Sequence, residues 1–377
     1  MKRLLGLDLA RSLALFGMVM VNIPVAFASQ DTGLAGLLCG AVAGRAAAVF
    51  VVLAGVGLSL MTRKGRTDPV RARLDRTLIL RRAAFLGLWG LAWYPLWPAD
   101  ILHYYGVWMA SAAWLFTLRS RHLLWLSGAV TLAFPLLLFG GLDYEWGWDW
   151  PTLTYTGFWT LRGFISNLLF NGLHPVFPWF AFFSFGMWLG RQELTEPALR
   201  RRLLWRAVPL WLAAEAFSAL VPELLVGGEV DLEVAKAIAG RGPMPPMPQY
   251  VLGAGALAVV VILGCVPLAD RRVTAGCLLT RSLVHTGQLA LTHYVSHVVL
   301  LLLPLTLLCA PEEFGLDGPP ILPASGPVLL LAMAIWMAVS VWASHRWRLG
   351  HQRRGPLEQL MRSLTTPRST SSGTSAP

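Results

Sequence analysis

Long apolar blocks make up most of this chain, and they restrict its fold more than any other feature. Each block is long enough to cross a hydrocarbon core of about 30 Å as an α-helix. Only 14% of the residues are charged, whereas soluble chains have about a quarter. We therefore predict an all-α polytopic transmembrane bundle of about ten spans. The blocks are residues 7–28, 41–62, 79–98, 101–118, 122–141, 173–190, 204–226, 249–268, 284–309 and 325–346.

The basic residues lie in the short segments between these blocks. If the N-terminus is cytoplasmic, 26 of the 31 lysine and arginine residues fall in cytoplasmic segments, as the positive-inside rule requires. One missed or extra span would break this alternation, so we expect an even number of spans and both termini in the cytoplasm. The net charge of +11 is thus a topology signal spread over many loops, and we expect no nucleic-acid partner.

Three segments refine this organisation. The blocks 79–98 and 101–118 are joined so closely that they predict a hairpin. Residues 155–172 are amphipathic and predict an interfacial helix, with an eleventh span as the alternative. We expect residues 1–350 to form the transmembrane domain and residues 351–377 a cytoplasmic tail. The tail is predicted to be disordered from about 365, because its Ser/Thr/Pro-rich sequence has nothing to bury.

Polar residues inside the first block are candidates for function. An ionisable side chain at membrane depth costs about 2.5–3.5 kcal/mol on insertion scales. Asp8 and Arg11 are three residues apart, so they share one helix face and form either a local ion pair or a functional site. Asn22 lies about three turns further along, close to the same face. Alone, Asn22 would be expected to make a helix-packing hydrogen bond.

The fourth block opens with Asp100, His103 and Tyr104, in the sequence DILHYYGV. Asp100 and His103 are at positions i and i+3, where a carboxylate can orient an imidazole as a base or proton shuttle. The alternative is an aspartate that caps the helix N-terminus beside an interfacial His–Tyr belt.

The ninth block carries His293 and His297 at positions i and i+4. This spacing can bind a metal, but there is no Glu between them and no third ligand, so we expect no metal site. We expect both histidines to line a water-filled cavity, for proton handling or substrate contact. Hydrogen-bonded packing histidines are the alternative.

Six polar residues from five helices should converge in the outer half of the bilayer, although separate snorkelling and capping roles are the alternative for each. Glu215 is another acid at depth, and the sequence does not show its partner. The six residues are Asn22, Arg45, Asp100, His103, His174 and His297.

Five motifs resemble those of a family of bacterial inner-membrane proteins of unassigned function, and this family is similar to the catalytic domain of heparan-alpha-glucosaminide N-acetyltransferase. In chain order the motifs are LDLARS, DILHYYGV, HPVFPWFAFFSFGMWLGR, TGQLALTHYVSH and GPLEQLMR. Ser12 stands where the family has Gly, and Asn22 where related sugar O-acyltransferases have His. The heparan enzyme pairs such an Asn with a His in the following loop, but residues 23–44 contain no His.

The resemblance implies a multi-pass inner-membrane acyltransferase. Such an enzyme takes an acyl group from cytoplasmic acyl-CoA, such as acetyl-CoA, and delivers it to a cell-envelope glycan or a lipid-linked acceptor. Acyl transfer needs a base and an oxyanion donor. His297 or His103 is the expected base, the latter with Asp100, and Asn22 is the expected oxyanion donor.

The same resemblance, together with the charges of the loops, suggests which residues bind the two substrates. The basic loop, with Arg63, Arg71 and Arg81, is expected to hold the CoA phosphates, although the positive-inside rule explains these residues equally well. The rival function is a transporter or exporter of a small solute or lipid intermediate, with the polar cavity as its path, but no internal repeat is visible. The acceptor, the acyl chain and the oligomeric state stay open. Expected substrate contacts are Asp8, Arg11, Arg45, His174, Tyr104 and His293.

Overall fold

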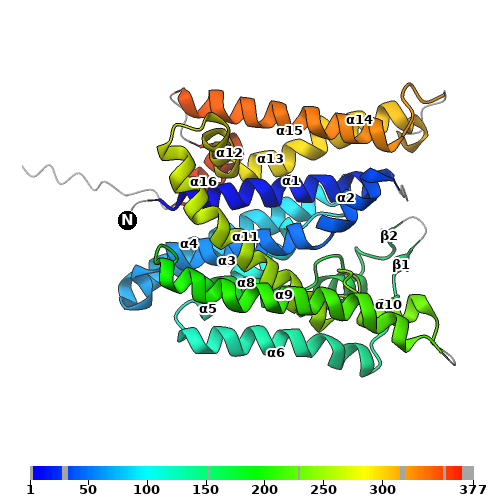
Figure 1. Cartoon of the computed structure of the whole chain (residues 1–377), viewed down its shortest axis with the longest axis horizontal. Coiled ribbons are helices and arrows are strands. Elements are labelled where there is room, and N and C mark those ends of the chain that lie inside the picture. The colour runs from blue at the N-terminus through cyan, green and yellow to red at the C-terminus, as the bar shows by residue number, and fades with distance from the viewer. Residues whose placement is uncertain are drawn as a thin grey trace, which may run out of the picture.

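The computed structural model describes residues 3–27, 33–150, 153–227, 230–314, 319–350 and 354–366. Most of these residues lie in helices whose axes run nearly along the longest axis of the molecule (Figure 1). The longer helices are α1 (Leu5–Phe27), α3 (Arg45–Met61), α4 (Pro69–Trp93), α5 (Leu102–Leu115), α6 (Ser120–Phe139), α8 (Val176–Leu189), α9 (Pro197–Leu225), α11 (Pro248–Thr274), α12 (Leu278–Gln288) and α15 (Gly326–Leu349).

Shorter elements connect and continue these helices. The short α-helices are α2 (Leu34–Val42), α7 (Leu161–Ser166), α10 (Leu232–Ala239), α13 (Ala290–His297), α14 (Leu303–Cys309) and α16 (Pro356–Thr365). The π-helical turns are η2 (Asn167–Asn171) and η3 (Val298–Leu302), and the 3-10 turns are η1 (Lys64–Arg66) and η4 (Pro311–Phe314). Two short antiparallel strands, β1 (Trp148–Asp149) and β2 (Thr154–Tyr155), pair in one loop.

Seven helical stretches of the described residues are long and apolar enough to cross a membrane, or eight if one bent pair counts as a span. The seven are α1, the combined stretch Leu34–Met61, α6, α9, α11, the stretch Ala290–Cys309 and α15. The protein is therefore a multi-pass helical membrane protein, as the sequence predicts. Ten spans and two cytoplasmic termini stay predictions.

Three of the ten predicted spans are not among the seven: α8 passes only as part of the bent pair, and the α4–α5 hairpin accounts for the other two. The two helices pack closely together, as the short connection predicts. Helix α4 carries arginines as far as Arg82, so only its second half is apolar. Helix α5 has 14 residues and is about 21 Å long, shorter than the hydrocarbon core. Length and composition alone therefore do not mark either helix as a span.

The amphipathic stretch 155–172 continues into the next helix. Its helical part, Leu161–Asn171, meets α8 at a bend of 49°, as a broken span or a re-entrant loop would. The interfacial helix and the eleventh span therefore both stay predictions.

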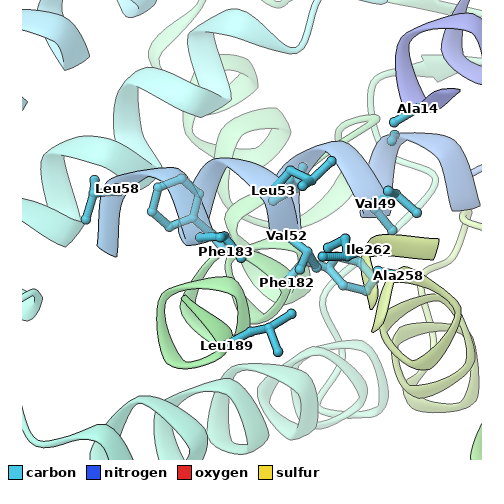
Figure 2. Close-up of a cluster of buried hydrophobic side chains, with 14 of the residues drawn as sticks. Ala14, Val49, Val52, Leu53, Leu58, Phe182, Phe183, Leu189, Ala258 and Ile262 are labelled. Carbon is cyan, nitrogen blue, oxygen red and sulfur yellow. The ribbon is translucent and has the colours of Figure 1, made fainter. Parts of the chain in front are cut away.

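Helix α3 lies at the centre of the bundle and packs against α1, α8 and α11. Figure 2 shows this core, in which Val52 of α3 lies near Phe182 of α8 and Ile262 of α11, while Leu53 projects from the other face of α3. These side chains are apolar and almost fully buried. Close packing of this kind is the main source of association between helices in lipid, where the hydrophobic effect between helices is weak.

The bundle has two chemically different ends. We call the end with η1, the start of α4 and α16 the basic end, and the end with β1, β2 and α10 the far end (Figure 1). Helix α16 packs against α4 and α13, so part of the predicted tail after residue 350 is an ordered helix. Residues 367–377, where we predict disorder, lie outside the described residues.

Candidate functional site

Tyr294 of α13 joins the polar residues that come together in the bundle. Its buried hydroxyl accepts a hydrogen bond from the backbone N–H of Ile101 (3.1 Å) and donates one to Oδ1 of Asp100 (3.2 Å). Its backbone carbonyl accepts a hydrogen bond from Nδ1 of His297. One residue thus links the start of α5 to the end of α13.

Asn22 and His297 form a pair between α1 and α13. The Nδ2 atom of Asn22 lies 2.9 Å from Nε2 of His297. Because a carbonyl can only accept, the contact with Tyr294 requires a proton on Nδ1 of His297. In the neutral ring Nε2 then carries the lone pair, and Asn22 donates to it. The pair therefore presents a neutral imidazole with its basic nitrogen directed at Asn22.

Asp100 and His103 form a second pair at the start of α5. Oδ2 of Asp100 accepts from the backbone N–H groups of Leu102 (2.8 Å) and His103 (3.1 Å), and lies 3.2 Å from Nδ1 of His103. Asp100 therefore both caps the N-terminus of α5 and orients the imidazole of His103. The two alternatives that the sequence allows for Asp100 thus hold together. Gly90 of α4 allows this approach, since a Cβ there would lie only 2.3 Å from the backbone nitrogen of His103.

The imidazole of His103 lies among aromatic rings. Nε2 is buried and has no hydrogen-bond partner among the described residues. The ring lies 3.9 Å from that of Tyr104, 5.8 Å from that of Tyr94 and 5.9 Å from that of Phe158. Because Nε2 is buried, a substrate reaches it only after neighbouring side chains move.

A cavity of about 150 Å³ lies beside both pairs. Its polar lining comes from Asn22, His174 and Tyr294, on α1, the α8 approach and α13, while Met18 and Trp179 provide apolar walls. The ring of His174 lies 4.5 Å from that of Trp179 and 6.0 Å from that of Tyr104. Small polar groups in a mostly apolar pocket are typical of a ligand site.

Two of the predicted site residues, Arg45 and His293, bind elsewhere. Arg45 forms an ion pair with Glu215 of α9 (2.6 Å), and Arg241 contacts the other oxygen of Glu215 (3.3 Å). Nε2 of His293 donates to Oγ of Ser344 on α15 (2.6 Å), because this hydroxyl itself donates to the carbonyl of Ser340. His293 and His297 thus form side-chain hydrogen bonds with different helices, although both rings lie near Trp336 of α15. Among the described residues, no group of three His, Cys, Asp or Glu side chains is placed to hold a metal ion.

Asp8 and Arg11 form their own network near the basic end. Asp8 is buried and accepts hydrogen bonds from Arg11 (2.7 Å), from Arg3 (2.6 Å) and from Gln288 of α12 (3.1 Å). The hydrogen bond to Asp8 raises the pKa of Arg3. The local ion pair that the sequence allows therefore exists, and it also ties α1 to α12.

The arginines expected at the CoA phosphates are exposed near the basic end. Arg71 is already paired with Asp75 (3.0 Å). Arg81 lies ten residues further along α4, about 15 Å away. Arg63 lies two residues after the end of α3. Burial is the main cause that lowers the pKa of Arg66, and the charge of Arg63 lowers it further. The side chains do not form one compact phosphate site.

The structure therefore brings together Asn22, Asp100, His103 and His297, with His174 on the cavity wall. It places Arg45, His293, Asp8 and Arg11 in other contacts. Tyr294 had no predicted role, although this residue stands in the motif TGQLALTHYVSH between the two histidines. Asn167, whose Oδ1 accepts from the hydroxyl of Tyr104 at 2.5 Å, had none either.

These features define a multi-pass membrane protein with a buried polar site toward the far end of its bundle. Residues 3–221, more than half of the chain, match the family of the catalytic domain of heparan-alpha-glucosaminide N-acetyltransferase, and the chain belongs to this family. Residues 189–368 match a family described as protein of unknown function (DUF418). The relationship that the five motifs predict is thereby confirmed. A comparison with curated proteins found no match.

Both matched regions contribute to the site. Asn22, Asp100 and His103 lie in the first region, and Tyr294 and His297 lie in the second. The polar cluster is complete only where the two regions pack together.

Proposed function

We propose that this protein is a membrane acyltransferase that moves an acyl group from acyl-CoA to a cell-envelope glycan or a lipid-linked acceptor. Family membership supports acyl transfer as the reaction class. The observation that carries the proposal is the Asn22–His297 pair, because one of its members lines the cavity and the other is held as a neutral base.

His297 is the base in this proposal. An acceptor hydroxyl or amine in the cavity gives its proton to Nε2 of His297 as its oxygen or nitrogen attacks the thioester carbonyl. The tetrahedral intermediate then releases the CoA thiolate, which takes up the proton. Since Nδ1 is already bound to the Tyr294 carbonyl, the ring needs no reorientation before the proton transfer.

Asn22 is the oxyanion donor. Asn22 lines the cavity, and its Nδ2 atom lies 2.9 Å from the His297 nitrogen that receives the proton. When the acceptor replaces this hydrogen bond, the amide is released to donate to the oxygen on which negative charge develops. One removed oxyanion donor typically costs about 10²–10³ in kcat.

The donor is proposed to approach from the basic end, where Arg63, Arg71 and Arg81 can contact its phosphates. The residues that line the cavity, such as Asn22 and Met244, lie toward the far end of the bundle. Acyl transfer along this axis requires the acyl group to reach the cavity past the middle of α1. Arg11 lies on this path, and its guanidinium would be 3.3 Å from a Cβ at Gly57.

The test uses the purified protein in lipid with acetyl-CoA. We expect measurable acetyl-CoA binding and slow hydrolysis or transfer. His297→Gln should lower turnover at least about a hundredfold and leave acetyl-CoA binding intact. His293→Gln is the matched control, because His293 lies one turn away on the same helix but bonds Ser344. Its turnover should stay within a few-fold of the wild type.

Three results would contradict this proposal or its base assignment. Absence of acetyl-CoA binding would overturn the enzyme function. Proton-coupled solute flux in liposomes, without acyl transfer, would favour the transporter. Loss of turnover in His103→Gln, with turnover retained in His297→Gln, would move the base to the Asp100–His103 pair.

A further inference from the structure

A second, larger cavity lies on the opposite side of α8 and α11 from the polar site. Its volume is about 470 Å³, and it is a groove with α6 and α9 as its two walls and α8 and α11 as its floor. Figure 1 shows α6 and α9 extending side by side along one edge of the bundle. Only 22% of the apolar stretch of α6 and 11% of that of α9 are buried inside the bundle, so we infer that this edge meets lipid.

The groove is apolar in its chemistry. Leucine, phenylalanine and alanine side chains make up most of its lining, and Gly128 and Gly255 leave it open. The two hydroxyl groups that reach it are already used, since Ser127 donates to the carbonyl of Ala181 and Thr131 donates to that of Ser127. The groove therefore offers no free polar group along its length and suits a hydrocarbon chain.

One end of the groove is basic. Arg206 is the only charged residue among the described residues that line it. Arg202 lies one turn before Arg206 on α9, and Arg121 lies one turn before Leu124 on α6, so both lie toward the same mouth. None of the three arginines forms an ion pair within the part of the chain that the structure describes. Trp188 lies at this mouth too, and tryptophan prefers the headgroup level of a bilayer.

The length of the groove matches one leaflet. Its α6 wall runs from Leu124 to Leu132, which is about 12 Å of helix, against about 15 Å for half of a hydrocarbon core. Its other end, at Leu210 and Pro248, is uncharged. The groove is thus charged at one end, apolar at the other, and long enough for one acyl chain.

We propose that this groove binds an anionic phospholipid of the leaflet at the basic end. One acyl chain lies between α6 and α9, and the phosphate lies against Arg206, with Arg202 and Arg121 nearby. A guanidinium forms two parallel hydrogen bonds to phosphate, which favours an anionic headgroup that carries no compensating positive charge. The site is separate from the acyl-transfer site and does not depend on the reaction proposed for it.

Two variants test the two halves of the proposal. Arg206→Gln removes the charge, and Arg346→Gln, an exposed arginine at the end of α15, is its control. Gly128→Leu fills the groove, because a Cβ at Gly128 meets nothing within 4 Å. Gly264→Leu is the matched control, since Gly264 is also an exposed helical glycine with nothing within 4 Å but does not line the groove.

The measurement is native mass spectrometry of the full-length protein, released from detergent after equilibration with phosphatidylglycerol or phosphatidylcholine. We expect the wild type and both controls to retain phosphatidylglycerol in preference to phosphatidylcholine. Arg206→Gln should lower phosphatidylglycerol retention about tenfold, as loss of a charge-assisted hydrogen bond does. Gly128→Leu should lower retention of both lipids, and circular dichroism checks that each variant is folded.

Three outcomes overturn the proposal. If the wild type retains the two lipids equally, the site does not select an anionic headgroup. If folded Gly128→Leu retains both lipids as the wild type does, the groove is not the lipid-binding site. A change of oligomeric state in Gly128→Leu, with lipid retention unchanged, shows instead that a second copy of the chain covers the groove.

Discussion

At the residue scale, the hydroxyl of Tyr294 provides the hydrogen bonds that join α13 to the start of α5. Removing it leaves Oδ1 of Asp100 and the N–H of Ile101 without their partner in a buried place. The hydroxyl of Tyr144 is also buried, but it has no hydrogen-bond partner among the described residues. A buried group that loses its partner costs about 1–3 kcal/mol, whereas removal of an unpaired hydroxyl costs little or stabilises.

We therefore expect Tyr294→Phe to destabilise the protein by about 1–3 kcal/mol and Tyr144→Phe to leave its stability nearly unchanged. Thermal unfolding in one detergent, with both variants and the wild type side by side, measures the difference. Equal Tm values for the two variants would show that the Tyr294 hydroxyl does not hold α13 against α5.

At the scale of elements, the closing motif of the chain supports the helix that carries the site. Helix α13 begins after a break at Leu289, so its first N–H groups have no partner within the helix. Glu358 of α16 accepts from the N–H groups of Leu291 (2.8 Å) and Thr292 (3.1 Å), and from the hydroxyl of Thr292 (2.6 Å). A carboxylate at a helix N-terminus is also favoured by the helix dipole. The basic end thus positions Tyr294 and His297 without touching them.

Glu358→Ala should cost about 2 kcal/mol through the loss of this cap. Glu358→Gln should recover part of that stability, since the amide oxygen still accepts. The readouts are the Tm and the turnover of each variant, with Glu313→Ala, an exposed glutamate in η4, as the control. If Glu358→Ala unfolds at the same temperature as the control, the cap has no part in ordering α13.

At the scale of the whole molecule, labelling of Cys277 can test the orientation of the bundle in the membrane. It lies between α11 and α12 at the basic end, five residues after Arg272 of α11. Hydrogen bonds from the side chain and backbone of Thr280 lower the pKa of its thiol. A lower thiol pKa means more thiolate at neutral pH, and the thiolate is the species that reacts.

If the basic end is cytoplasmic, a membrane-impermeant maleimide should label Cys277 only after cells are permeabilised. A cysteine introduced at Asp143, in the loop before β1, should be labelled in intact cells. Both tests use a chain whose remaining cysteines are replaced by alanine. If Cys277 is labelled in intact cells, the basic end faces outward and the predicted topology is wrong.

The same thiol tests the effect of Thr280. Thr280→Ala removes one hydrogen bond to the sulfur and should raise the thiol pKa, so the labelling rate in permeabilised cells should fall at neutral pH. At a pH well above both pKa values the two rates should converge, because both thiols are then ionised. A rate difference that persists there would indicate altered access rather than altered pKa.

Much of the fold follows from local sequence. The apolar blocks predict α1, α6, α9, α11 and α15 because a helix in lipid needs only its own length and composition to be stable there. The hairpin of α4 and α5 follows from its short connection. The break at Leu289 and the bend before α8 do not follow, since each depends on contacts with other helices.

The candidate site could be predicted only in part. Asn22, Asp100, His103 and His297 attract notice because polar groups in lipid are costly, but their spacing does not show their partners. Tyr294 gives no such signal, since tyrosine is common near membrane interfaces. Arg45 does give the signal, yet it is bound to Glu215.

The sequence by itself determined the class of protein, the series of helices and a set of polar residues that need partners. These properties depend on residues close together in the chain, where length, apolarity and charge act locally. The tertiary structure alone decided that His297 pairs with Asn22 across 275 positions and that Tyr294 joins both to Asp100. Such pairs form where helices from distant parts of the chain pack together, and neither helix alone contains that information.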